Sequence, residues 1–447
     1  MIQQEIFVCG ESILSHPVTF LFHLDDTVHK GEPTKKVLAD LKLVIADCRV
    51  ALAKKIAEWV DVALSVDKPV LLLCPDADTL ADLHKHVGVL PILPVAALLI
   101  KRTKNESGLM NFAVDALDYS ETESKSGSDS GPSRSGAREK KPASAASQME
   151  CACTDYATLS RVFVDASAVD TFKMKVETAM EKKEGLAPRD GTPPTGLKYF
   201  LHVFSTNFSF TYSGAGASNK PGNATFTWTV WGFLNQTAQS NSQYLSVEGR
   251  INVYAGELHR NDSCDRGFGN AYVRGTLTAP MNALAFVPTS GSGDFSGTVD
   301  IPISYKSPLG GYQIWNYNSS MNNKIDSWSC KAISSAASLG AQWWMNRPCD
   351  GSNVPDKWKD AFSFWGHVHD FTGASSGSLD VNSISAWVTP TLLTGYQTIS
   401  GDFSWEGAHF WGSSCSPGMY WGINAYWMWF YNANPGFRVD FTPINPS

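Results

Sequence analysis

Residues 40–75 read DLKLVIADCRVALAKKIAEWVDVALSVDKPVLLLCP, and this stretch decides the fold predicted for the N-terminal part of the chain. Its first apolar run, Leu43–Ala46, is uncharged and mostly branched, which is typical of a buried parallel strand. Apolar side chains then recur at helical spacing from Leu52 to Leu64, and a second apolar run covers Pro69–Cys74. Strand, helix and strand in this order predict a βαβ unit within a larger parallel sheet.

The composition of the chain changes near residue 195. Of the 15 tryptophans, only Trp59 precedes this point, and Ser, Thr, Asn and Gly become frequent after it. A chain of 447 residues is long enough for two or three domains. We predict an α/β nucleotide-type domain over 1–187, a Pro-rich linker over 188–196 and an aromatic-rich β-sandwich over 197–447. A Ser/Gly-rich stretch at about 104–154 is expected to be a flexible insertion in the first domain.

The second half of the chain has the pattern of antiparallel β structure. Runs that alternate between polar and apolar residues, such as Tyr199–Phe204, Thr225–Trp231 and Gly297–Tyr305, are separated by Gly, Asn, Ser and Pro. The predicted fold class is therefore an α/β Rossmann-like N-terminal domain with a parallel sheet, followed by a large all-β antiparallel sandwich or jelly roll.

Charge and the N-terminal residues limit the expected partners and location. The formal net charge of −7 argues against nucleic-acid binding through a basic patch. The N-terminus has neither a basic region nor a long apolar run, so we expect no signal peptide and a cytoplasmic or virion location rather than a secreted one. Cys9, Cys48 and Cys74 adjoin apolar runs and are expected to be buried thiols. No cofactor is expected.

Several motifs in residues 1–75 suggest a nucleotide-related family. A strand runs into a Cys-Gly turn at Phe7–Ser12, Asp47 ends a short apolar strand, and Glu58 precedes the strand Lys68–Leu72. This series is similar to the nucleoside 2-deoxyribosyltransferase-like fold and, within it, to the 2'-deoxynucleoside 5'-phosphate N-hydrolases. The resemblance implies that Glu58 attacks the anomeric carbon of the sugar and that Asp47 positions a sugar hydroxyl. It also implies that Gly10 and Ser12 bind the ligand.

One part of this motif differs from the family. The family has a turn containing Ser and Gly before the catalytic Glu, whereas this chain has the helical run VALAKKIA at residues 50–57. Val60 stands where the family usually has Gly after the Glu. A helix at this place leaves no open backbone for a phosphate or a sugar. We therefore expect a degenerate, non-catalytic domain, with an N-glycosidase that uses Glu58 as the alternative.

A second candidate site is the sequence His367-Val-His369-Asp370. On a strand, His367 and His369 would point to the same face, which is a common arrangement for two metal ligands. A third ligand would have to come from elsewhere in the chain, and histidines packed in the core are the alternative interpretation.

A third candidate site is aromatic. Trp427, Trp429 and Tyr431 alternate in the run YWMWFY at residues 426–431, so they would share one face of a strand. Exposed rings of this kind stack on sugars, insert at a membrane interface or become buried in a subunit contact. The expected partners are therefore a glycan or a membrane surface, and other copies of the chain in a homo-oligomer. A tryptophan-rich sandwich core is the alternative.

Three functions follow from these observations. The first is a non-catalytic, two-module binding or assembly protein, in which a degenerate nucleotide-fold domain is joined to a sandwich that binds glycan, membrane or itself. The second is a nucleotide N-glycosidase, and the third is a self-assembling structural protein such as a viral jelly-roll coat subunit.

Overall fold

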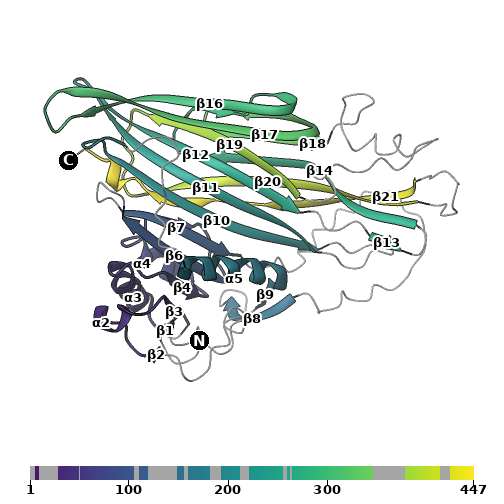
Figure 1. The fold of residues 1–447 in the computed structure, drawn as a ribbon, viewed down its shortest axis with the longest axis horizontal. Helices are drawn as coiled ribbons and strands as arrows, with labels where there is room; N and C mark the ends of the chain where they lie inside the picture. Colours follow the sequence, from purple (N-terminus) through teal and green to yellow (C-terminus); the bar gives the residue numbers. More distant parts are fainter. Residues whose placement is uncertain are drawn as a thin grey trace.

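The computed structural model describes residues 6–9, 29–49, 51–104, 110–118, 148–155, 160–181, 193–211, 221–254, 259–261, 264–345, 378–412 and 423–446. The strands in these ranges form one 11-stranded sheet, one 9-stranded sheet and one 2-stranded sheet. Figure 1 shows the long strands of the two large sheets running roughly along the long axis of the molecule, with the helices gathered beside the N-terminal strands.

The 11-stranded sheet, here called sheet 1, runs through both halves of the chain. Its order is β15-β19-β12-β11-β10-β7-β6-β4-β3-β1-β2. The strands of the first half are β1 (Ile6–Cys9), β2 (His29–Lys30), β3 (Leu43–Asp47), β4 (Val70–Leu73), β6 (Ala97–Lys104) and β7 (Met110–Leu117). Those of the second half are β10 (Tyr199–Thr211), β11 (Pro221–Gln236), β12 (Asn241–Tyr254), β15 (Asn282–Val287) and β19 (Ser378–Thr389).

The predicted Rossmann-like domain with its own parallel sheet is wrong. β2, β1, β3 and β4 do pair in parallel, but β4 pairs antiparallel with β6, and β6 antiparallel with β7. β7 then pairs with β10, so the sheet continues into the second half without an edge. The division into an α/β domain and an independent all-β sandwich or jelly roll does not describe this sheet. Edge strands pair through backbone groups that every residue has, so the sequence of β7 does not reveal its partner.

The 9-stranded sheet, here called sheet 2, packs face to face on sheet 1. It contains β5 (Val89–Pro91), β13 (His259–Asn261), β14 (Cys264–Thr278), β16 (Gly291–Lys306), β17 (Tyr312–Ser334), β18 (Ser338–Met345), β20 (Tyr396–Gly412), β21 (Ile423–Ala433) and β22 (Phe437–Asp440). The third sheet pairs β8 (Gln148–Asp155) with β9 (Ser160–Asp165), and the short 3-10 helix η3 (Thr442–Ile444) follows β22.

Helices cover both faces of the N-terminal end of sheet 1. On one face lie α2 (Lys35–Leu38), α3 (Ala53–Ser65) and α4 (Ala77–Leu83), and on the other lies α5 (Ala166–Glu181) (Figure 1). Ile56, Val60 and Leu64 of α3 are buried because they recur on one side of the helix. Phe172 and Val176 of α5 pack on the opposite face of the sheet.

The N-terminal half is joined to the second half through one strand pair in each large sheet. β7 pairs with β10 of sheet 1 from Phe112↔His202 to Leu117↔Asn207. β5 pairs with β22 of sheet 2, where Val89 lies opposite Val439. The side chains of both halves also belong to one continuous hydrophobic core, which includes Val89 and Phe112 together with Phe200, Phe204 and Phe437. The N-terminal half is therefore held by backbone ladders and by shared apolar packing.

Candidate functional site

The strands β16 and β17, joined by the turn at residues 307–311, form a long amphipathic hairpin, here called the hairpin. Along β16 the buried side chains alternate with exposed ones. The buried set is Phe295, Val299, Ile301, Ile303 and Tyr305, and the exposed set includes Ser296, Thr298, Asp300, Pro302 and Lys306. This period of two is the pattern of a strand with one apolar and one polar face.

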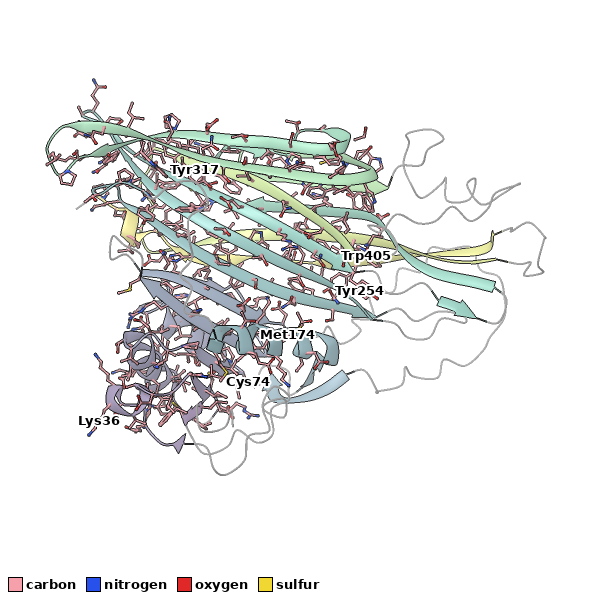
Figure 2. All side chains as sticks on the ribbon, viewed as in Figure 1. Lys36, Cys74, Met174, Tyr254, Tyr317 and Trp405 are labelled. Atoms are coloured by element: carbon pink, nitrogen blue, oxygen red, sulfur yellow. The ribbon has the colours of Figure 1, made fainter. Side chains whose placement is uncertain are left out.

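The hairpin crosses the outer face of sheet 1. Residues 328–334 of β17 pair with β18, while the part nearer the turn pairs with β16 in the described ladders. That part packs against sheet 1 in a hydrophobic cluster separate from the main core, which includes Tyr199, Trp231, Phe233, Ile301 and Ile303. Figure 2 shows Tyr317 of β17 toward the end of the molecule where β16 and β17 are joined, away from Tyr254 and Trp405.

A glycine lets the hairpin pass over the edge of sheet 1. A Cβ atom on Gly297 would lie 2.5 Å from Cγ1 of Val287 in β15, which is closer than real Cβ contacts. Glycine at this position therefore allows β16 to lie directly on the edge strand.

The carboxylate of Glu248 in β12 holds the middle of the hairpin. It accepts hydrogen bonds from the Tyr317 hydroxyl at 3.0 Å and from the Ser319 hydroxyl at 2.8 Å. Burial of the ring, and then the charge of Glu248, raise the pKa of Tyr317 far above its ordinary value. Hydrogen bonds to a charged acceptor are stronger than neutral ones, so Glu248 is a main polar attachment of the hairpin.

Two asparagines provide further attachments. The Asn323 side chain in β17 donates to the backbone oxygen of Asn382 at 2.7 Å and accepts from its backbone N–H at 2.8 Å. The Asn235 side-chain oxygen accepts from the backbone N–H of Ser304 at 2.7 Å. Side-chain amides here replace the backbone ladder that would otherwise join two strands.

A cavity of about 600 Å³ lies between the hairpin and sheet 1. Its lining includes Thr227, Thr229, Glu248, Asn322 and Asn382. Trp231 also lines it, and the indole Nε1 of Trp231 is buried with no hydrogen-bond partner among the described residues. This space is partly open to solvent, so the hairpin is not packed against sheet 1 along its whole length.

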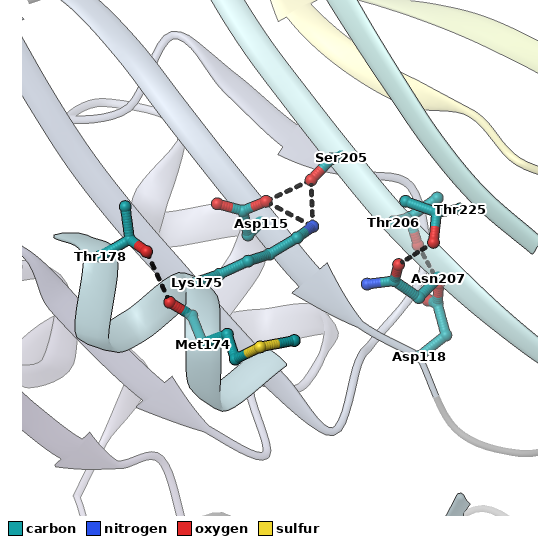
Figure 3. Close-up of polar contacts among 9 residues, drawn as sticks. All are labelled: Asp115, Asp118, Met174, Lys175, Thr178, Ser205, Thr206, Asn207 and Thr225. Carbon is teal, nitrogen blue, oxygen red and sulfur yellow. Dashed lines mark hydrogen bonds and ion pairs between the residues drawn. The ribbon is translucent and has the colours of Figure 1, made fainter. Parts of the chain in front are cut away.

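The contact between the two halves of the chain, here called the seam, consists of β7, β10 and the α5 side chains that lie on them. Lys175 Nζ is 2.8 Å from Asp115 Oδ1 and donates to the Ser205 hydroxyl at 2.7 Å, and Ser205 in turn donates to Asp115 (Figure 3). Thr206 donates to Asp118, whose pKa is raised to about 6 by burial.

His202 of β10 lies at the centre of the seam. The backbone N–H of Phe112 donates to its Nδ1 at 3.2 Å, so the neutral ring carries its proton on Nε2. Phe200 stacks on the ring at 5.1 Å between centroids. Burial lowers the pKa of His202 to about 3, and its Nε2 has no partner within the described ranges.

The residues predicted for nucleotide chemistry lie apart from these features. Asp47 is fully buried, and its carboxylate is bound by Arg49, whose Nε lies 2.8 Å from Oδ1. Glu58 is exposed on α3. Gly10 and Ser12 lie outside the described residues. Asp47 is thus buried and paired whereas Glu58 is exposed, and the roles of these four residues stay predictions.

The predicted metal and aromatic residues are only partly described. His367 and His369 lie outside the described residues. Trp427 and Trp429 are on β21, opposite His409 and Gly407 of β20, but their side chains are not among those described. Tyr431 is half-buried and packs edge-on to Phe403 at 6.5 Å between ring centroids. Their roles in binding stay predictions.

Sequence reasoning missed Glu248, Tyr317 and the other residues that attach the hairpin. The alternation of Gly297–Tyr305 predicts a strand, which is confirmed as part of β16, and this alternation is the available signal. Nothing in that run indicated that its apolar face packs on the outer side of another sheet. In the described part of the chain, no helix has the length and apolar character needed to cross a bilayer.

Comparisons with known proteins give structural likeness alone. No family model matches the chain, and no curated protein matches it. Clostridium perfringens delta-toxin is similar with a TM-score of 0.36 and 11% identity, over 54% of this chain and 90% of that one. A pore forming protein matches with a TM-score of 0.35 and 12% identity, over 54% and 92%. The Clostridium perfringens NetB toxin in its membrane inserted form matches with a TM-score of 0.34 and 11% identity, over 53% and 96%.

These findings correct the predicted family and functions. None of the three structures is a nucleoside deoxyribosyltransferase, and no family model supports that resemblance. The functions inferred from the sequence, namely a two-module protein with a nucleotide-fold domain, an N-glycosidase and a viral coat subunit, were also wrong. Sheet 1 leaves no separate nucleotide-fold module, and the three structures are two toxins and a pore forming protein.

The expected cytoplasmic or virion location was wrong as well. Cys74 is disulfide-bonded, although it was expected to be a free thiol, while Cys9 and Cys48 are free and buried. Disulfides persist in oxidising environments and are rare in the cytosol. The expected partners, a glycan, a membrane surface or other copies of the chain, stay predictions at this point.

Proposed function

We propose that this protein binds membranes and self-assembles into a transmembrane pore, and that the hairpin is the segment that crosses the bilayer. The observation that carries the proposal is an amphipathic hairpin that is attached to sheet 1 through side chains, with no backbone ladder between the two in the described residues. The apolar face of β16 packs on sheet 1, and its polar face is exposed.

The length and pattern of the hairpin fit a bilayer. Its continuous ladder pairs residues 294–306 with residues 312–324. A strand needs about 9–11 residues to cross the hydrocarbon core. Membrane strands alternate between side chains that face lipid and side chains that face water, as β16 does. Val299, Ile301 and Ile303 would face lipid, and Asp300 and Lys306 would face water.

A single hairpin cannot remain alone in lipid, because its outer backbone groups would have no hydrogen-bond partners. Hairpins from several copies satisfy these groups when they pair edge to edge in a closed ring. The proposal therefore includes a homo-oligomer. It also requires the hairpin to leave sheet 1, and the cavity and the few polar attachments beneath it favour such a release.

The proposal is tested by locking the hairpin to sheet 1. Asn323 and Asn382 are in direct contact, so Asn323→Cys/Asn382→Cys is suited to a disulfide between β17 and β19. We expect the parent protein to release dye from liposomes, the oxidised double variant to release none, and reductant to restore release. The parent with and without reductant, and each single variant, are the controls. Equal release from the oxidised and reduced double variant would rule out hairpin insertion.

A further inference from the structure

The turn of the hairpin carries a small group of exposed apolar side chains, here called the tip. Leu309 is 96% exposed, Ile314 is 72% exposed and Tyr312 is 49% exposed. Ile314 lies on the outward face of β17, where the next outward residues are the exposed Asn316 and Asn318. Exposed apolar side chains that gather on a solvent-facing surface make it a candidate binding surface.

The turn holds the tip in an outward position. The backbone N–H of Ser307 donates to the oxygen of Gly311 at 3.0 Å, and the N–H of Gly310 donates to the oxygen of Ser307 at 3.0 Å. The N–H of Leu309 donates to the Ser307 hydroxyl at 3.2 Å. Gly310 and Gly311 have φ values of 94° and 78°, which favour glycine. These hydrogen bonds order the backbone of the turn, on which Leu309 is exposed.

The chemistry of the tip fits a lipid surface. Leucine and isoleucine insert into the acyl region, tyrosine is enriched where the acyl chains meet the headgroups, and a long basic side chain keeps its charge in water. Lys306 is exposed at the start of the turn and provides that basic group. A stable protein interface buries about 1,200–2,000 Å² in total, which is more than these few side chains supply.

We infer that the tip is the surface through which the protein first contacts the bilayer, with Leu309, Tyr312 and Ile314 entering the membrane interface before the rest of the hairpin. The inference rests on the proposed function, since it names the part of the hairpin that meets lipid first. It places initial binding at the turn and not at the aromatic run of β21.

Paired serine variants test this inference. Leu309→Ser/Ile314→Ser removes the two most exposed side chains of the tip. The matched control is Leu52→Ser/Leu93→Ser, because Leu52 is 82% exposed and Leu93 is 66% exposed elsewhere on the molecule. Binding is measured by co-sedimentation with phosphatidylcholine vesicles, and pore formation by dye release from the same vesicles. Leu309→Phe, which keeps an apolar side chain, tests for rescue.

We expect the tip variant to lose binding by about tenfold or more, the control variant to bind like the parent, and Leu309→Phe to bind normally. Equal binding by the tip and control variants, or a parent that does not bind vesicles, would overturn the inference. A parent that binds through the tip but releases no dye contradicts the proposed function and supports the inference. Unchanged melting temperatures in both serine variants show that the folded protein is being compared.

Discussion

Sheet 1 is covered at two places in two different ways. At the seam, β7 adds a backbone ladder to β10, and Phe112 enters the same core as Phe200 and Phe204. Over its outer face, the hairpin packs in a separate small cluster and is joined to sheet 1 by side chains such as Glu248 and Asn323. The seam combines a backbone ladder with a shared core, whereas the hairpin is held on sheet 1 by apolar packing and side-chain hydrogen bonds alone, so we expect the hairpin to separate more readily.

The largest expected effect is at the shared core. Phe204 is 1% exposed and stacks on Trp228 at 5.8 Å between ring centroids. Phe204→Ala should lower the free energy of unfolding by about 3–5 kcal/mol, because it leaves a cavity where both halves of the chain pack. Denaturant unfolding measures this value, and the two halves should still unfold in one transition. Two separate transitions in the parent protein would show that the seam is not a permanent connection.

Acid should act on the seam through two opposing groups. The folded state keeps His202 neutral, with a pKa of about 3. The contribution of His202 to the free energy of unfolding is therefore complete above about pH 6.5, the pKa of histidine in the unfolded chain. It decreases by about 3 kcal/mol when the pH falls from there to about 4.5. Acid has the opposite effect on stability through Asp118, because the pKa of this carboxyl is raised to about 6 in the folded state. Folding then gains about 2 kcal/mol from Asp118 over the same range.

Single substitutions separate the two groups. His202→Gln should make the protein more stable at pH 4.5 than at pH 7, relative to the parent, because the Asp118 effect remains. Asp118→Asn should make it less stable at pH 4.5. Denaturant unfolding at both pH values measures the free energy of unfolding. If this free energy changes equally with pH in the parent and in both variants, then His202 and Asp118 do not cause its pH dependence.

A smaller effect is expected at the hairpin. Glu248→Ala leaves the Tyr317 and Ser319 hydroxyls without their acceptor, which should weaken docking of the hairpin by about 2 kcal/mol. That change corresponds to about 30-fold in an equilibrium constant. It is measured by thiol labelling of Val299→Cys, a position of β16 that is 2% exposed because its side chain faces sheet 1. An unchanged labelling rate would mean that Glu248 does not hold the hairpin.

The smallest effect is expected beside the hairpin. Arg250 Nε donates to Asp380 Oδ1 at 2.8 Å, and Asp380 raises the pKa of Arg250, but both side chains are exposed at the rim of the cavity. Asp380→Asn should change stability by less than about 1 kcal/mol and leave labelling of Val299→Cys unchanged. It is the control for Glu248→Ala, because it changes the charge of the cavity and leaves the attachments of the hairpin intact.

Local elements could be predicted from the sequence better than their arrangement. The strand, helix and strand expected in residues 40–75 are present as β3, α3 and β4, because apolar periodicity is a local property. The sheet around them was predicted wrongly, because the pairing of Phe112 with His202 joins residues that are distant in the sequence. Backbone hydrogen bonds between strands depend little on which side chains the strands carry, so the sequence pattern does not predict which strands pair.

The candidate site shows the same limit. The alternation in Gly297–Tyr305 is identical for a strand in a sandwich and for a strand that enters a membrane, so the sequence identified the strand without its use. Glu248 and Tyr317 meet across different strands, and neither belongs to a motif. The resemblance that suggested Asp47 and Glu58 rested on local similarity in a stretch whose main role here is packing.

The position of β5 and β7 has a consequence for producing parts of this protein. A recombinant fragment that begins at residue 193 would lack both strands, so the edges of β10 and β22 would become free together with the apolar surface of Phe200, Phe204 and Phe437. Free edges beside apolar surface promote aggregation. Soluble preparations of the second half alone should therefore require the N-terminal half in the same solution, supplied as a separate chain.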